Sequence, residues 1–384
     1  MPNLPNLRTD CRHFHGDRPC APHKAHGVEC ATCTEHYDPV QHRLLIVKLA
    51  AMGDVLRTTS MLRGIHRRWP GAHVTWVTAP GSVPLLKDNP LVDRVVGWGG
   101  GGVPLELLSE TYDVVVNPDA APDSCALASV ARLTEGGERV GFGFDGRGTP
   151  VPLGQGAADW MAMGLSDELK KANTRTYQSL MADVLEIDYR REPPTFVIDE
   201  EAGRRGAELR KLCHPGDDHL LVGLNTGAGG RWKYKRWTEA GYTELIRRLG
   251  EAGHRVLLLG GPEEVERNQR LVAASGGVAV DTGCDNPLAS FAGIVEACDV
   301  VVTGDTLAMH VSIARRVPVV VLFGPTSLHE IDVFDLGERL APEDLECLVC
   351  YRPDCDVSPN CMELLSVDRV HEAVLRAGRL VATT

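Results

Sequence analysis

The sequence predicts two successive α/β domains, each built on a doubly wound parallel sheet. Short runs of apolar, β-branched residues, such as Leu44–Val47 and Val300–Val302, recur along the chain, and such runs are typical of strands buried on both faces. Segments with helical spacing of apolar residues alternate with these runs, and this alternation favours parallel strands covered by helices. A charged and then proline-rich stretch, Arg190–Pro194, interrupts the pattern and suggests a linker. A length of 384 residues is comfortable for two domains.

The chain divides into four parts on this basis. Residues 1–42 form a segment rich in Cys and His, with little apolar content. Residues 43–192 form the first α/β domain, and residues 193–365 form the second, which includes a cysteine-rich stretch at 347–361. Residues 366–384 form a last helix that we expect to cross back over the first domain. The expected strands are Leu44–Val47, Val74–Val77, Val95–Trp98, Val114–Val116, Val140–Gly143, Leu221–Leu224, Val256–Leu259, Val300–Val302 and Val317–Phe323.

Charge and hydropathy exclude several classes of protein. The formal net charge of -12 argues against nucleic acid as the main partner. No run of apolar residues is long enough to span a membrane, and the N-terminus lacks the apolar core of a signal peptide. We therefore expect a cytoplasmic protein. The helix after the first strand is locally basic, so it is either a solvated face or a docking surface for an anionic acceptor or the inner membrane face. Its basic residues are Arg57, Arg63, Arg67 and Arg68, preceded by Lys48.

Eight of the cysteines fall into two groups. In a cytoplasmic chain, such groups point to metal ligation rather than to disulfides. Four thiolates suit a structural zinc or iron ion, and free thiols in a mobile arm are the alternative for the first group. The first group is Cys11, Cys20, Cys30 and Cys33, where a nearby His could replace one Cys, and the second is Cys347, Cys350, Cys355 and Cys361.

The stretch Asp299–Ser327 predicts an anion site. It reads as a strand, then a helix over Thr306–Arg315 with Asp305 at the N-cap position, then a second strand. A helix that starts just beyond a parallel strand presents free backbone N–H groups and the positive end of its dipole. We expect the diphosphate of a sugar nucleotide there, although many such helix starts bind only water.

Two further loops belong to the same half of the chain. The small residues of Asn225–Gly230 would let a phosphate approach the backbone, and Arg231 or Lys235 could neutralise it. Glu263 and Glu264 follow the end of another expected strand, Val256–Leu259. A carboxylate there either accepts hydrogen bonds from a ribose or base or lies in the first turn of a helix.

The segments LLIVKLAAMGDVLRTTSMLRGI, NTGAGGRWKYKRWT, LLLGGPEE and VVVTGDTLAMHVSIARRVPVVVLFGPTS together resemble the ADP-heptose glycosyltransferases of the lipopolysaccharide heptosyltransferase family. The resemblance covers about residues 43–384 in order and spacing. It implies the GT-B fold, in which two Rossmann-like domains face each other, with the donor in the second domain and the acceptor against the first. It also implies transfer with inversion at the anomeric carbon, and no metal for the chemistry.

The resemblance assigns roles to individual residues. Asp54 matches the general base that takes the proton of the acceptor hydroxyl, and Lys235 matches the lysine that offsets the charge of the leaving diphosphate. A plain helix-capping role is the alternative for Asp54. The residues expected on the donor side, from the resemblance or from the loops above, are Thr226, Gly227, Arg231, Glu263, Glu264, Asp305, Thr306 and His310.

Some features depart from the family pattern and leave alternatives open. Leu307 stands where many members have Gly, which puts the donor sugar in doubt, and the N-terminal Cys/His segment is not part of the basic family plan. The second cysteine group is similar to a metal finger of the members that heptosylate proteins, so the acceptor is either a lipopolysaccharide-core or other glycan, or a protein. A sugar-nucleotide 2-epimerase and a non-catalytic sugar-nucleotide-binding protein are the remaining alternatives.

Overall fold

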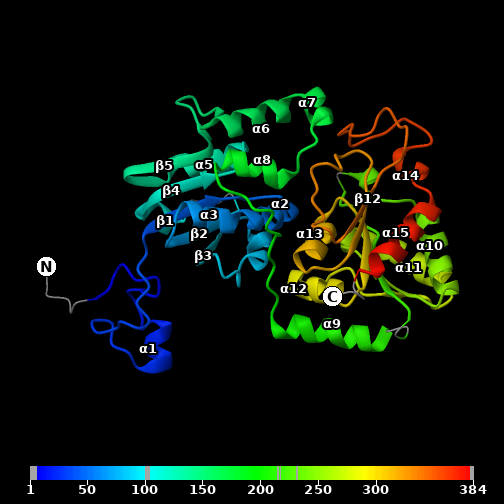
Figure 1. The fold of residues 1–384 in the computed structure, drawn as a ribbon, viewed down its shortest axis with the longest axis horizontal. Coiled ribbons are helices and arrows are strands. Elements are labelled where there is room, and N and C mark those ends of the chain that lie inside the picture. The colour runs from blue at the N-terminus through cyan, green and yellow to red at the C-terminus, as the bar shows by residue number, and fades with distance from the viewer. Residues whose placement is uncertain (1–6, 100–103, 214–215, 217, 231, 381–384) are drawn as a thin grey trace.

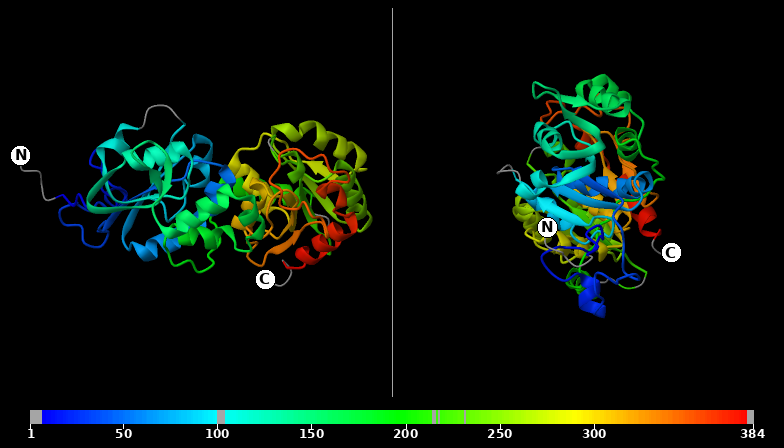
Figure 2. Two further views of the ribbon diagram at one scale, coloured as in Figure 1. Left: turned by 90° about the horizontal axis from the view of Figure 1, so that it is seen from above. Right: turned by 90° about the vertical axis from the view of Figure 1, so that its left-hand side faces the viewer.

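The computed structural model describes residues 7–99, 104–213, 216, 218–230 and 232–380. The chain forms two α/β lobes placed end to end, and the N-terminal segment projects from the outer end of the first lobe (Figures 1 and 2). Each lobe holds one six-stranded sheet. Strands β1 to β6 form the sheet of the first lobe, and strands β7 to β12 form that of the second. The expected fold class, two Rossmann-like parallel-sheet domains that face each other, is confirmed.

The first lobe has the strand order β3-β2-β1-β4-β5-β6, with β1 to β5 parallel and β6 antiparallel to β5. The expected strands are present, and the segment after them adds a hairpin strand and three helices. Its strands are β1 (His42–Val47), β2 (Ala72–Thr78), β3 (Arg94–Gly97), β4 (Thr111–Asn117), β5 (Arg132–Phe144) and β6 (Pro150–Pro152); its helices are α2 (Met52–Thr58), α3 (Leu62–Arg68), α4 (Leu105–Ser109), α5 (Pro122–Val130), α6 (Gln155–Leu165), α7 (Asp167–Ala172) and α8 (Tyr177–Val184).

The second lobe has the order β12-β11-β10-β7-β8-β9, with every pair parallel. Its strands are β7 (Leu221–Asn225), β8 (Arg255–Leu259), β9 (Ala279–Asp281), β10 (Val300–Gly304), β11 (Val319–Leu322) and β12 (Gly337–Leu340); its helices are α9 (Glu200–Cys213), α10 (Glu239–Glu251), α11 (Val265–Ala274), α12 (Leu288–Glu296), α13 (Leu307–Ala314), α14 (Cys361–Leu364) and α15 (Val367–Gly378).

The central strands are buried on both faces, as their composition predicts. Leu44 and Leu45 point to opposite faces of the first sheet, and both are 0% exposed, as are Val300, Val301 and Val302 in the second. Continuous apolar strands therefore sit inside a helix–sheet–helix sandwich, and only the strand ends and the loops beyond them are free to carry polar groups.

The last helix corrects one expectation. Helix α15 packs on α10 and on strands β10, β11 and β12 of its own lobe, instead of crossing back over the first domain. Its apolar side chains, including Val370 and Val374, are completely buried in the core of the second lobe. Burial of that face on the adjacent sheet leaves no apolar stripe to cover another domain.

Most of the basic residues after β1 are paired with carboxylates, which reduces the positive charge of this face. Lys48 pairs with Asp119 at 2.6 Å and is buried. Arg67 pairs with Glu192, and Arg68 pairs with Glu138 and Glu186. Among these residues, Arg63 is the exposed one for which the described part of the chain shows no ion pair. A strongly basic surface is therefore not formed.

The N-terminal segment contributes one short helix, α1 (Ala21–His26), and is otherwise irregular. Arg12 joins it to the first lobe, because its guanidinium pairs with Asp93 and donates to the carbonyl of Ala72 at 3.0 Å. In the part of the chain that the structure describes, no helix is long and apolar enough to cross a bilayer.

Candidate active site

The candidate site lies where the carboxyl ends of the two sheets face each other. In each sheet the strand order reverses beside the first strand, between β1 and β4 and between β7 and β10, and such crevices are the usual ligand sites of open α/β sheets. Asn225 at the end of β7 donates to Thr303 (3.0 Å) and to Thr306 (3.2 Å) across the second crevice. The polar ends of β7 and β10 are thus held together by one buried amide.

Asp54 lies on the first turn of α2, directly after β1. One carboxylate oxygen accepts the backbone N–H of Ala51 at 3.3 Å, and the other pairs with Arg57 at 2.7 Å. Burial by itself would raise the pKa of Asp54, but the positive charges of Arg57 and Lys48 and the neighbouring His310 outweigh it and lower that pKa to about 2. The side chain is 35% exposed, so Asp54 is an ionised and partly exposed carboxylate.

Helix α13 of the second lobe meets α2 of the first. A Cβ atom on Gly53 would lie 2.7 Å from Cδ2 of His310, so only glycine permits this approach. Burial above all, and then the charge of Arg57, lowers the pKa of His310 to about 4, so its imidazole is neutral at pH 7. Asp54 and the start of α13 therefore face each other across the gap.

The N-cap of α13 is Thr306 rather than the expected Asp305. The Asp305 carboxylate turns instead to Lys235, whose Nζ lies 2.7 Å away, and accepts the hydroxyl of Thr326 at 2.9 Å. The charge of Lys235 favours the anion strongly enough to hold the pKa of Asp305 below its ordinary value although burial opposes this. A cation is thus fixed beside the start of a helix that follows a parallel strand.

A cavity of about 570 Å³ opens at the carboxyl edge of the second sheet. Glu264 lines it: one of its carboxylate oxygens accepts the N–H of Gly261 at 2.9 Å, and the other is buried with no hydrogen-bond partner among the described residues. That oxygen is ready to accept a hydrogen bond from a ligand. The other lining residues include Met52 of the first lobe, Gly227, Glu263, Asn286, Thr306 and Leu307.

The structure brings most of the predicted residues together, with exceptions. Thr226 is completely buried and donates its hydroxyl to Asn268 at 2.6 Å, so this side chain faces away from the cavity. Arg231 lies outside the described residues. Sequence reasoning missed Asn225 and Thr326 as site residues, although both stand at the ends of strands that were expected.

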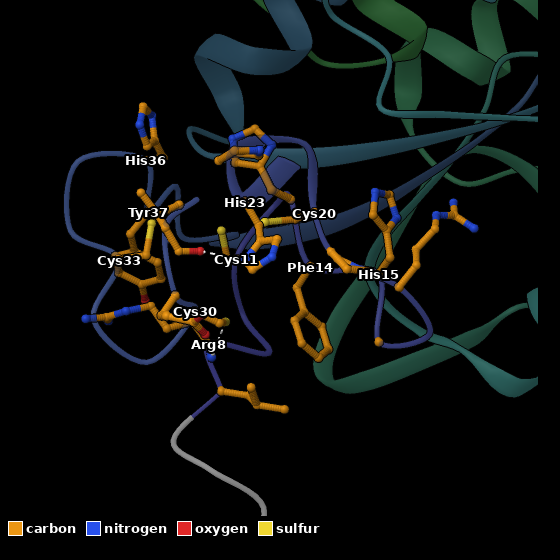
Figure 3. Close-up of a pocket in the computed structure, with 18 of the residues that line it drawn as sticks. Arg8, Cys11, Phe14, His15, Cys20, His23, Cys30, Cys33, His36 and Tyr37 are labelled. Carbon is orange, nitrogen blue, oxygen red and sulfur yellow. Dashed lines mark hydrogen bonds between the residues drawn. The ribbon is translucent and has the colours of Figure 1, made fainter. Parts of the chain in front are cut away.

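The two cysteine groups each gather around a hollow. Cys11, Cys20, Cys30 and Cys33 line a cavity of about 370 Å³ together with His23 and His36 (Figure 3). Cys347, Cys350 and Cys355 line a smaller hollow of about 170 Å³. Burial first, and then those three sulfurs, raise the pKa of Cys361 to about 11, so the fourth cysteine lies near them. Within the described ranges, however, no three His, Cys, Asp or Glu side chains are placed so that they could hold a metal ion.

Comparison with known proteins identifies the family. Residues 105–352 match glycosyltransferase family 9 (heptosyltransferase). The chain belongs to this family. It is therefore a glycosyltransferase by descent, and the resemblance seen in its motifs is confirmed.

Individual relatives agree with this assignment. Lipopolysaccharide heptosyltransferase 1 of Pseudomonas aeruginosa is 28% identical over 345 residues, which cover 83% of this chain and 88% of that protein. The structure of E. coli ADP-heptose lps heptosyltransferase II is similar with a TM-score of 0.64 at 19% identity, covering 89% of this chain and 100% of the other. The iron-containing dodecameric glycosyltransferase TibC from enterotoxigenic E. coli is similar with a TM-score of 0.53 at 14% identity, covering 89% and 80%. The two structural similarities show a shared fold.

Proposed function

We propose that this family 9 glycosyltransferase moves a heptose from ADP-heptose to a sugar hydroxyl of a lipopolysaccharide-core acceptor, with Asp54 as the general base. The observation that carries the proposal is the close approach of α2 and α13, which sets an ionised carboxylate opposite the cation-lined start of a helix beside the 570 Å³ cavity. The names of the relatives supply the donor and the acceptor class.

In this mechanism Asp54 takes the proton of the acceptor hydroxyl. The oxygen then uses the electron pair of the former O–H bond to form a bond with the anomeric carbon. The bond from that carbon to the diphosphate oxygen breaks on the opposite face, and the leaving ADP carries away the electron pair. The configuration is therefore inverted. Asp54 is ionised at neutral pH and partly exposed, so it is available as a proton acceptor.

The second lobe stabilises the leaving group. The ammonium of Lys235 and the N-terminal end of α13 carry positive charge, and this charge is favourable where negative charge develops on the diphosphate. Asp305 and Thr326 fix the position of Lys235 without consuming all its donors. The unpartnered oxygen of Glu264 suits a hydroxyl of the donor ribose or an N–H of the base.

Asp54→Asn tests the assignment, because it keeps the shape of the side chain and removes the base. We expect transfer to fall at least about 100-fold, the usual contribution of a positioned base, while ADP still raises the thermal midpoint of unfolding. Unchanged turnover would rule out Asp54 as the base. If the sugar of the donor is epimerised in the absence of acceptor, the epimerase alternative is favoured. If the donor binds but is never consumed, a binding protein is favoured. Transfer to protein but not to heptose-deficient lipopolysaccharide would move the acceptor to the protein class.

We also propose that each cysteine group holds a structural zinc or iron ion. The support is that four thiols line the first hollow, that three line the second with Cys361 nearby, that thiolate is a ligand of both metals, and that TibC, which shares the fold, contains iron. As placed, the side chains do not form a closed ligand set, so binding would require them to rotate inwards. Elemental analysis of the full chain, prepared without chelators, would show about one metal ion per group, and the absence of both metals would refute the proposal.

A further inference from the structure

Arg57 is an unusual residue of the candidate site. Its guanidinium pairs with Asp54 through one nitrogen at 2.7 Å, and its central carbon lies 3.5 Å from the centre of the Tyr177 ring. The side chain is only 14% exposed, and its Nε is buried with no hydrogen-bond partner in the described part of the chain. A guanidinium presents several N–H donors in a planar fork, so much of the donor capacity of Arg57 is unused.

The surroundings hold this guanidinium in place at the meeting of the lobes. Tyr177 contacts the hydroxyl of Thr58 at 2.8 Å, and its backbone N–H donates to the carbonyl of Glu330 in the second lobe at 2.9 Å. The stacking ring is therefore anchored from both sides, and it leaves the edge of the Arg57 fork beside Asp54. A rigid, partly unsatisfied guanidinium beside a partly exposed carboxylate is suited to a planar anion.

We propose that Arg57 recognises the acceptor: its guanidinium binds an acidic group, a carboxylate or a phosphate, that lies next to the hydroxyl deprotonated by Asp54. This inference rests on the proposed function, because it takes Asp54 as the base. It gives Arg57 a role that Lys48, Arg67 and Arg68 do not share, since those residues pair with other carboxylates whereas Arg57 pairs with the proposed base itself.

The same contact links recognition to catalysis. Without acceptor, the charge of Arg57 is the main influence that overcomes burial and keeps the pKa of Asp54 low, and so weak a base is poorly matched to a sugar hydroxyl. An acidic group that engages Arg57 offsets this charge, so the pKa of Asp54 rises. A correct acceptor therefore strengthens the base that acts on it, while water and neutral sugars do not.

The test uses the full-length protein and heptose-deficient lipopolysaccharide in three forms: intact, enzymatically dephosphorylated, and with its carboxylates reduced to alcohols. We expect the wild type to lose roughly 10- to 100-fold in kcat/KM on the form that lacks the recognised group, the range of a hydrogen bond to a charged partner. Which form is affected identifies the group as phosphate or carboxylate. Arg57→Met should be equally poor on all three forms, and Arg57→Lys should keep part of the preference because it retains the charge without the fork.

Arg63→Met is the matched control, since Arg63 belongs to the following helix and is exposed. It should keep the wild-type preference, and ADP-induced thermal stabilisation of every variant shows that the fold is intact. Calorimetric titration measures the affinity for each of the three acceptor forms, so it tests Arg57 even if no transfer occurs. The absence of transfer by itself would count only against the proposed function. An Arg57→Met protein that still distinguishes the acidic from the neutralised acceptor as the wild type does would overturn the inference.

Discussion

Gly53→Ala should separate catalysis from stability, because Gly53 lies where α2 and α13 meet. The added Cβ would lie 2.7 Å from Cδ2 and 3.3 Å from Nε2 of His310, whereas ordinary van der Waals contact begins at 3.4 Å. His310 is 7% exposed, so its ring has little room to move away. The shortfall of about 0.7 Å must then be taken up by α2 and α13 moving apart.

The two consequences differ in size. Alanine is favoured over glycine in a helix by about 1 kcal/mol, and overpacking costs about 1–3 kcal/mol, so the free energy of unfolding should fall by no more than about 2 kcal/mol. A misplacement of about 1 Å in a reacting group can cost about 100-fold in rate. We therefore expect kcat/KM for heptosyl transfer to fall between about 10- and 100-fold.

The assay compares initial transfer rates with the thermal midpoint of unfolding. Gly203→Ala is the control, because Gly203 lies in helix α9, where a Cβ meets nothing within 4 Å. This variant should keep full activity and gain about 0.5–1 kcal/mol of stability. A Gly53→Ala protein with activity within twofold of the wild type and an unchanged midpoint would show that catalysis does not depend on this close approach.

Three further predictions concern single side chains. The pKa of His310 is lowered from 6.5 to about 4 in the folded protein, so the unfolded chain takes up the extra proton first as the pH falls. The corresponding part of the free energy of unfolding is therefore fully present above pH 6.5 and is lost as the pH falls towards 4. His310→Gln should abolish up to about 3 kcal/mol of this pH dependence in urea unfolding, and identical curves for both proteins would contradict it. Thr326→Val removes the donor to Asp305 with little change in shape, so turnover should fall up to about tenfold; an unaltered rate would show that this hydrogen bond is dispensable. Gly227→Ala places a Cβ 2.6 Å from the carboxyl carbon of Glu264, so affinity for ADP, measured by titration, should drop about tenfold, and wild-type affinity would argue against Glu264 as a nucleoside ligand.

The strands and the loops at their carboxyl ends could be predicted well from the sequence. Runs such as Leu44–Val47 and Val300–Val302 are apolar because both faces are covered, and the loop beyond each run is where a parallel sheet carries its polar groups. For that reason Asp54 and Lys235 could be placed near the gap from their position after a strand. The family resemblance added their roles, which remain proposals.

Side-chain pairing and helix docking could not be read in the same way. The sequence shows Arg67 and Arg68 as part of a basic helix, but their partners Glu192 and Glu138 are distant in the chain and meet them only in the folded protein. The apolar stripe of α15 likewise predicts that the helix packs on another surface, but it does not identify the sheet that provides this surface. Both cases concern contacts between parts far apart in sequence.

Because α15 stays on its own lobe, the described chain passes from one sheet to the other once, through residues 190–199. Each lobe is thus formed by one continuous stretch of chain, although the two lobes contact each other. Chimaeras that join residues 43–189 of this chain to the second half of a family member with a different nucleotide sugar should need a single junction. Such exchanges would let donor and acceptor preferences be inherited, or engineered, independently.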